Sequence, residues 1–184
     1  MRVSQIVSLC NQLCNLELPV NCDSSFTIST AHENATLRKL IVCCNTVLED
    51  LYCNYFTVIA TCEVTATGGV IDTSKLDFCR VLKLTDKNGN NVRYRYTENG
   101  LFAEDGDYLL TYAKRPAAVD WFTEVVLPSS RISERVVVYG MLAEYFLAVE
   151  DLELALAWET RYQNALHAAS IKNSSMTLPV GKWC

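Results

Sequence analysis

The chain closes with two apolar helical stretches, in the segment ISERVVVYGMLAEYFLAVEDLELALAWETRYQNAL at residues 132–166. Apolar side chains recur at helical spacing up to about Val149, and they recur again from Leu152 onwards. Only Glu150 and Asp151 separate the two stretches, and so short a connection places two helices antiparallel and in contact. The segment therefore predicts a helical hairpin at the end of the fold.

The N-terminal part of the chain has the same periodicity in two places. Residues 2–15 carry an amphipathic helical pattern that Pro19 ends, and residues 21–30 have the polar composition of a loop. A longer apolar face runs to about Leu51. We expect this second helix to start near Thr30, because Glu33 three residues later completes a capping box.

The middle of the chain changes to a β pattern. Residues 55–65 are dense in β-branched and aromatic side chains and predict a strand that Gly68-Gly69 ends. Residues 78–85 and 91–97 predict two strands joined by a tight turn, since Asn88-Gly89 supplies the positive φ angles that a hairpin needs. A further strand is expected over residues 107–113.

Together these elements predict an α+β fold. Two N-terminal helices and the C-terminal antiparallel hairpin form a helical body, and a small antiparallel β meander is inserted between them. No internal repeat or composition shift marks a domain boundary, so residues 1–170 are expected to form a single domain. The remaining residues, 171–184, read as an extended C-terminal tail.

Composition narrows the classes of function. The net charge of -5 and the interspersed acids argue against a protein that grips nucleic acid through phosphates. No apolar run approaches the roughly 18–20 residues that span a bilayer, and no secretory signal is visible at the N-terminus. We therefore expect a soluble intracellular product that binds neither a membrane nor a specific nucleic acid.

The nine cysteines predict free thiols in a reducing compartment, because their number is odd and no signal peptide precedes them. Cys10 and Cys14 share a helical face, and Cys43 and Cys44 are adjacent, but no CxxC pair occurs. The chain has two histidines, whereas zinc needs four converging ligands. Small buried side chains are the favoured reading, and no metal site is predicted.

A search for catalytic and cofactor motifs finds none. Phosphate-binding glycine loops, zinc-protease and serine-hydrolase motifs are missing from the sequence. The acids Glu104, Asp105 and Asp107 fit a turn better than a cation site. Four tyrosines on predicted strands fit a buried face better than a base-stacking surface; they are Tyr94, Tyr96, Tyr108 and Tyr112. No catalytic, cofactor-binding or metal-binding residue is predicted.

The order of elements and two local phrases resemble the head–tail connector, or adaptor, proteins of tailed phages. The first phrase is the close of the sheet, YLLTYAKRP at residues 108–116. The second is the hairpin itself, with YGMLAEYF at residues 139–146 and WETRYQNAL at residues 158–166. The resemblance covers roughly residues 108–166, and the N-terminal half matches in layout alone.

This resemblance implies a non-enzymatic virion protein in the neck, made in the host cytoplasm. It implies a homo-oligomeric ring, a dodecamer, docked beneath the portal protein and contacted below by the next tail or neck component. The tail would bind the portal, through Ile171, Leu178, Pro179, Val180 and Trp183. The hairpin tip would face the tail side, through Asp86, Lys87, Asn88 and Gly89.

Two other classes of function stay open on the sequence. One is a cytosolic domain that binds a small ligand or single-stranded nucleic acid on the tyrosine-bearing sheet. The other is a cysteine-dependent enzyme in which His32 or His167 approaches a thiol, and it predicts one cysteine that reacts much faster than the rest.

Overall fold

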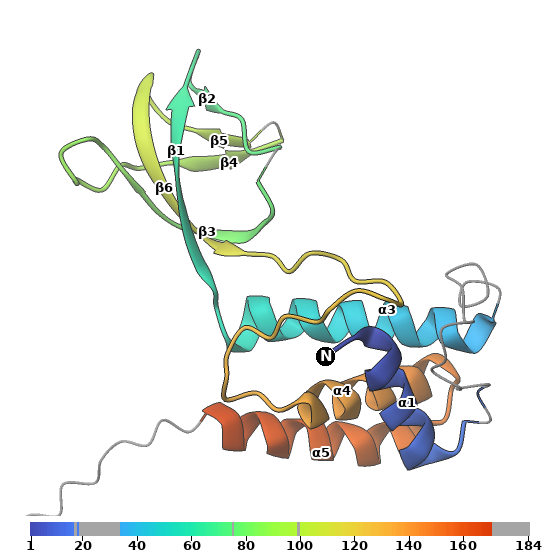
Figure 1. Ribbon diagram of the computed structural model, residues 1–184. Helices are drawn as coiled ribbons and strands as arrows, with labels where there is room; N and C mark the ends of the chain where they lie inside the picture. Colours follow the sequence, from blue (N-terminus) through green and yellow to red (C-terminus); the bar gives the residue numbers. More distant parts are fainter. Residues whose placement is uncertain (17, 19–33, 75, 99, 171–184) are drawn as a thin grey trace, which may run out of the picture.

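Helices from the two ends of the chain meet in one lobe, and the middle of the chain forms a second, β-rich lobe (Figure 1). The computed structural model describes residues 1–16, 18, 34–74, 76–98 and 100–170. The predicted α+β class is confirmed, with the β region inserted between N-terminal and C-terminal helices.

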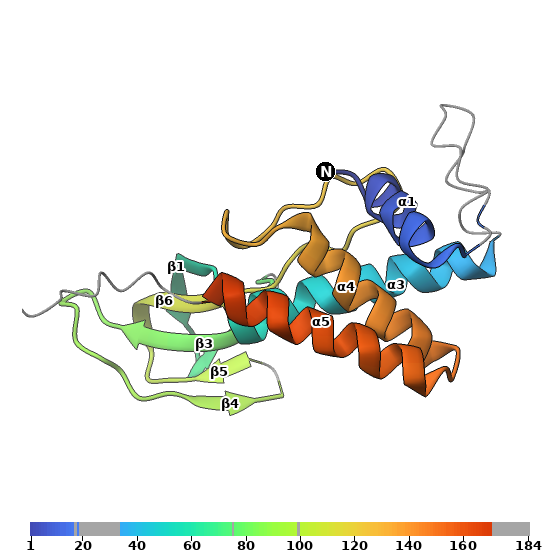
Figure 2. The ribbon, with the colours of Figure 1, turned by 90° about the horizontal axis from the view of Figure 1, so that it is seen from below.

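The helical lobe is built around α4 (Glu134–Ala148), which packs against three other helices. These are α1 (Val3–Cys14), α3 (Ala35–Asp50) and α5 (Leu152–Ser170). Figure 2 shows α4 and α5 side by side, with α1 on the other side of α4. The α4–α5 pair is the predicted hairpin, and the carboxylate of Asp151 caps α5 by accepting the Leu154 N–H at 3.1 Å.

α3 begins later than predicted. Asn34 is its N-cap, and its side-chain oxygen accepts the N–H groups of Thr36 at 3.0 Å and Leu37 at 3.2 Å. The predicted start near Thr30 is therefore too early, while the capping box of Thr30 and Glu33 lies outside the described part of the chain. Asparagine is the better N-cap of the two residue types, but the Thr30 prediction gave more weight to the glutamate three residues later.

α3 also ends differently from the prediction. It runs into a π-helical turn, η1 (Leu51–Tyr55), closed by the Phe56 N–H donating to the Leu51 carbonyl at 2.8 Å. The first strand starts only at Ile59, four residues after the predicted start at Tyr55. The aromatic and β-branched residues between them belong to the turn and to the passage into the β lobe.

The β lobe contains two antiparallel three-stranded sheets. The first has β6 (Gly106–Lys114) between β1 (Ile59–Ala66) and β3 (Phe78–Thr85). The second has β5 (Gly100–Phe102) between β2 (Val70–Ile71) and β4 (Arg95–Thr97). The strand order differs from a simple meander, because the last strand pairs with the first, and the strand predicted over 91–97 is reduced to its last three residues.

Each lobe has its own apolar core. The helical core is formed by α1, α3, α4, α5 and the segment between the β lobe and α4, and it includes Leu37, Leu40, Met141 and Leu142. The β core is a smaller separate cluster that includes Ile71, Leu84, Leu101 and Leu110. Contacts between the lobes are therefore few, and those at the junction determine how the lobes are joined.

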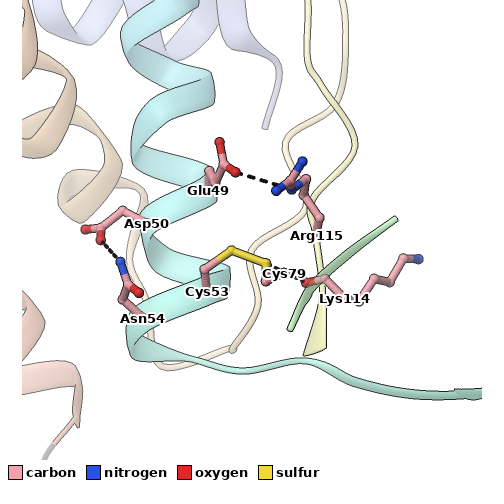
Figure 3. The surroundings of a disulfide bond; sticks show 7 residues. All are labelled: Glu49, Asp50, Cys53, Asn54, Cys79, Lys114 and Arg115. Atoms are coloured by element: carbon pink, nitrogen blue, oxygen red, sulfur yellow. Dashed lines mark hydrogen bonds and ion pairs between the residues drawn. A yellow bond between two sulfur atoms is a disulfide. The ribbon is translucent and has the colours of Figure 1, made fainter. Parts of the chain in front are cut away.

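A disulfide between Cys53 of η1 and Cys79 of β3 links the two lobes across 26 residues of sequence (Figure 3). Beside it, the Arg115 Nε lies 3.3 Å from a carboxylate oxygen of Glu49. The expectation of free thiols is wrong for Cys53 and Cys79, because the return of β3 to the end of α3 brings their Cα atoms to 5.8 Å. It holds for Cys10, Cys14, Cys43, Cys44 and Cys62.

The three long helices cross closely at Gly140 of α4. A Cβ atom at this position would lie 2.9 Å from both methyl carbons of Val47 and 3.0 Å from a ring carbon of Tyr162. The Tyr162 hydroxyl donates to a carboxylate oxygen of Asp50 at 3.0 Å. This crossing fixes α3, α4 and α5 relative to one another and positions the surface described next.

Candidate interaction surfaces

The predicted tail-side contact is the turn between β3 and β4, which projects from the side of the β lobe (Figure 1). The Asp86 carboxylate accepts the N–H groups of Asn88 at 2.9 Å and Asn90 at 2.8 Å, together with the Asn90 side-chain amide at 3.1 Å. The hydrogen bonds from Asn90 hold the pKa of Asp86 below its usual value. Gly89 has the predicted positive φ, +83°, but Asn88 does not, and β3 and β4 belong to different sheets. The tight two-residue hairpin predicted at Asn88-Gly89 is therefore not formed.

Lys87, the next residue of the turn, folds back over the first sheet. Its Nζ lies 2.8 Å from a carboxylate oxygen of Asp107, which also accepts the Thr65 hydroxyl at 2.8 Å. This pairing raises the pKa of Lys87 and lowers that of Asp107. Both side chains are exposed, so the pair adds little stability. Asp86 and Lys87 are thus engaged within the chain. Asn88 and Gly89 are exposed, and their N–H groups donate to the Asp86 carboxylate and the Asp86 carbonyl, respectively.

The same turn borders a hollow of about 540 Å³ on the first sheet. Its charged lining residues are Glu63, Asp86, Lys87 and Asp107, three acids and one base. The sequence predicted a turn at Asp107. Its contact with Lys87 was not predicted, because that contact depends on β6 lying next to β3.

The predicted portal-binding residues Ile171, Leu178, Pro179, Val180 and Trp183 lie outside the described residues. What the structure describes is the helix from which they follow, α5, which ends at Ser170.

A surface that the sequence reading did not single out lies along the α4–α5 hairpin, and we call it the hairpin groove. It has a volume of about 570 Å³ and is lined by Ala143, Glu144 and Leu147 of α4 and by Leu152, Ala155, Leu156 and Glu159 of α5. Its leucines are unusually open for apolar side chains: Leu147 is 54% exposed, Leu152 62% and Leu156 68%. Clustered exposed leucines of this kind mark an interaction surface in a soluble protein.

The acids of the hairpin groove lack a basic partner. Glu144 has no ion pair or hydrogen bond within the described residues, and Glu159 accepts the side-chain amide of Gln163 at 2.7 Å. Burial raises the pKa of Glu144, and the nearby carboxylates of Glu159 and Asp50 raise it further. The groove therefore combines exposed leucines with two half-buried carboxylates.

A smaller hollow of about 340 Å³ lies between α3 and the end of α4. Its lining includes the exposed Val42, the buried Cys43 and Ala148, with Arg38 and Lys39 at its edge. The groove and this hollow together extend the exposed apolar surface across three helices.

The residues that recur at helical spacing along the last helix are Leu152, Ala155, Leu156, Glu159, Tyr162 and Leu166. The structure buries Ala155, Tyr162 and Leu166 and exposes the two leucines. The sequence contains one signal for this exposure, because the apolar stripe on α5 is wider than one neighbouring helix can cover.

The cysteines of the helical core are poorly suited to nucleophilic chemistry. Burial raises the pKa of Cys43 to about 11 and that of Cys44 to about 12, and it also raises the pKa of Cys10. A buried thiol with a raised pKa stays protonated and unreactive near neutral pH. Among residues placed by the structure, no three His, Cys, Asp or Glu side chains gather in a way that would hold a metal ion.

The strand tyrosines do not form one open aromatic face. Tyr94, Tyr108 and Tyr112 pack against the β core. Tyr96 is exposed, but its ring meets the edge of Tyr94 at 5.8 Å and its hydroxyl accepts the Val81 N–H at 3.1 Å. The engagement of these rings within the lobe weakens the reading of the sheet as a base-stacking platform.

No family model and no curated protein matches this sequence. Of the helices in the described ranges, none combines the length and the apolar character needed to cross a membrane.

Proposed function

We propose that this chain is a structural subunit of a phage neck, which associates with further copies of itself into a ring below the portal and joins the head to the tail. Its role is binding, and no catalytic step is assigned to it. The hairpin groove serves as the contact between neighbouring copies, the segment after Ser170 binds the portal, and the β3–β4 turn faces the next tail component.

The observation that carries the proposal is the set of exposed leucines in the hairpin groove. Leu147, Leu152 and Leu156 project from two helices that the crossing at Gly140 holds rigidly. A rigid apolar surface between helices offers a preformed contact, which loses little conformational freedom on association. The cost of leaving three leucines in water is removed when a second copy covers them.

The same hairpin carries the resemblance to the head–tail connectors, within residues 139–166. The two-lobed shape also suits a neck subunit, since one lobe presents helices for packing between copies while the other extends from them (Figure 1). In the β lobe, Asn88 and Gly89 are exposed at the tip of the β3–β4 turn, and the hydrogen bonds to Asp86 keep this tip in a defined shape for an external contact.

The test is ring formation on purified portals of the same phage, imaged by negative-stain electron microscopy. The wild-type chain is expected to form a complete ring below the portal. The double variant Leu152→Glu/Leu156→Glu places two charges in the hairpin groove and is expected to leave single copies on the portal.

Leu154→Glu is the matched control, because Leu154 is exposed on the same helix yet does not line the groove. It is expected to form rings normally. Rings from the double variant would overturn the groove as the contact, and a wild-type chain that never binds portals would overturn the neck function. A variant lacking residues 171–184 that still binds portals would remove the tail from the mechanism.

A further inference from the structure

Fourteen residues follow Ser170, and their composition complements the hairpin groove. The segment reads IKNSSMTLPVGKWC at residues 171–184. It contains Lys172 and Lys182 but no aspartate or glutamate, whereas the groove is lined by Glu144 and Glu159 and by no basic residue. Its apolar residues are concentrated toward its end, in Leu178-Pro179-Val180 and Trp183.

The segment is long enough to reach the groove of its own chain. From Ser170 back to Glu159 is eleven residues of helix, about 16 Å, and from Ser170 to Leu152 is about 27 Å. Seven extended residues span about 23–25 Å, so a segment that turns back along α5 brings Leu178 to the level of Leu156. On this path Lys182 lies beyond Leu152, and Lys172 is the lysine closer to Glu159.

The order of polar and apolar residues also matches along this path. The face of α5 nearest Ser170 is polar, with Gln163 and His167 exposed, and the leucines of the groove lie beyond it. A segment running back along α5 would lay its polar first half, residues 172–175, over the polar part of the helix. Its apolar second half would then lie over Leu152 and Leu156.

From the groove, the charge and the reach, we propose that in the free subunit residues 171–184 fold back along α5 of the same chain and cover the hairpin groove. Val180 and Leu178 pack on the exposed leucines of the groove, and a lysine ammonium pairs with Glu144 or Glu159. Glu144 is half-buried and has no other partner among the described residues. Such a pair is stronger than one in water, because the local dielectric is lower.

This arrangement has a consequence for assembly, which rests on the proposed function. If the groove is the contact between copies and the same segment binds the portal, the two events are coupled. Portal binding withdraws the segment from the groove and exposes the surface that the next copy needs. Ring formation is thereby restricted to subunits already on a portal.

Carbodiimide cross-linking of the full-length protein tests the fold-back directly, in the absence of any portal. The reagent condenses a lysine amine with a nearby carboxylate into an amide, and the oxygen lost from the carboxylate leaves in the urea that the reagent becomes. The cross-linked protein is digested, monomer and dimer fractions alike, and the linked peptides are identified by mass spectrometry. We expect links from Lys172 or Lys182 to Glu144 or Glu159.

Glu153 supplies an internal control, because it is exposed on the same helix and does not line the groove. Links to Glu153 are expected to be several-fold rarer. A mixture of light and ¹⁵N-labelled protein distinguishes the occupant: the proposal requires links within one isotopic chain. Mixed-isotope links would assign the groove to the tail of a second copy, and links no more frequent than those to Glu153 would refute the docking.

A second variant keeps the lysines and removes the apolar contact. Leu178→Ser/Val180→Ser is expected to lower the yield of groove links by roughly tenfold or more, since two buried aliphatic side chains are lost from the docked state. An unchanged yield would overturn the apolar part of the proposal. Links present without rings on portals would refute the neck function while leaving the fold-back intact.

Discussion

The disulfide between Cys53 and Cys79 makes a quantitative prediction about stability. The bond closes a loop of 26 residues that contains β1 and β2. In the chain-entropy description, closing a loop of this size reduces the entropy of the unfolded chain by about 12 cal/mol/K, which corresponds to about 3.5 kcal/mol at 25 °C. That is a large part of the roughly 5–15 kcal/mol that stabilises a folded domain.

Cys53→Ser is therefore expected to lower the free energy of unfolding by about 3.5 kcal/mol. For a chain of this size the loss corresponds to a decrease of roughly 7–14 °C in the midpoint of thermal unfolding. The other junction contact cannot compensate, because the ion pair between Glu49 and Arg115 is half exposed and worth about 1 kcal/mol at most. Circular dichroism during heating measures the shift, with and without a reducing agent.

Cys62→Ser is the matched control, since it removes a half-buried free thiol from β1 and leaves the bond intact. Its midpoint should fall only slightly and should still respond to reductant, whereas that of Cys53→Ser should not respond. Equal midpoints for oxidised wild type, reduced wild type and Cys53→Ser would refute the loop-closure reasoning. Alkylation before and after reduction, followed by mass measurement, establishes that the bond is present in the sample.

Three further predictions follow from single contacts. Gly140→Ala should destabilise the fold by about 1–3 kcal/mol despite the better helix propensity of alanine, because its Cβ meets the methyl groups of Val47 at 2.9 Å; thermal unfolding should show recovery in Gly140→Ala/Val47→Ala. Glu144 has a raised pKa, so the folded state binds more protons than the unfolded chain and stability falls as pH rises between the usual and the raised pKa. In a chain that ends at Ser170, where no tail lysine can pair with Glu144, Glu144→Gln should thus raise the melting temperature at pH about 7 and have little effect at pH about 3.5, where the unsubstituted group is protonated in both states. Asn34→Ala should cost about 1 kcal/mol in urea denaturation through loss of the α3 cap, and Asn34→Asp should cost much less.

The helices were predictable because their evidence is local. The hairpin connection at Glu150-Asp151 and the periodicity on both sides of it are contained in one stretch of sequence, and the structure places α4 and α5 there. Some local predictions were wrong where one stretch of sequence was compatible with two structures. Asn34 and Thr30 both cap helices well, and the aromatic run after Leu51 suited a strand as much as a π-helical turn.

Features that depend on distant parts of the chain were not predictable. The bond between Cys53 and Cys79 requires β3 to return to the end of α3, and this follows from the pairing of β6 with both β1 and β3. The exposure of Leu152 and Leu156 depends on which neighbours cover α5. Periodicity defines an apolar stripe, but the number of helices available to cover it is a property of the whole fold.

The junction between the lobes has a mechanical consequence. The chain passes between the lobes twice, and the two passages are hydrogen-bonded side by side, the Lys114 N–H donating to the Val58 carbonyl at 2.8 Å. Two adjacent extended segments resist stretching but allow twisting about their common axis. The disulfide attaches β3 to η1 beside these two passages (Figure 3). A second attachment point of this kind restrains the twist. A torque applied to the β lobe is then transmitted to α3. Reduction of the Cys53–Cys79 disulfide would allow the two lobes to rotate relative to each other.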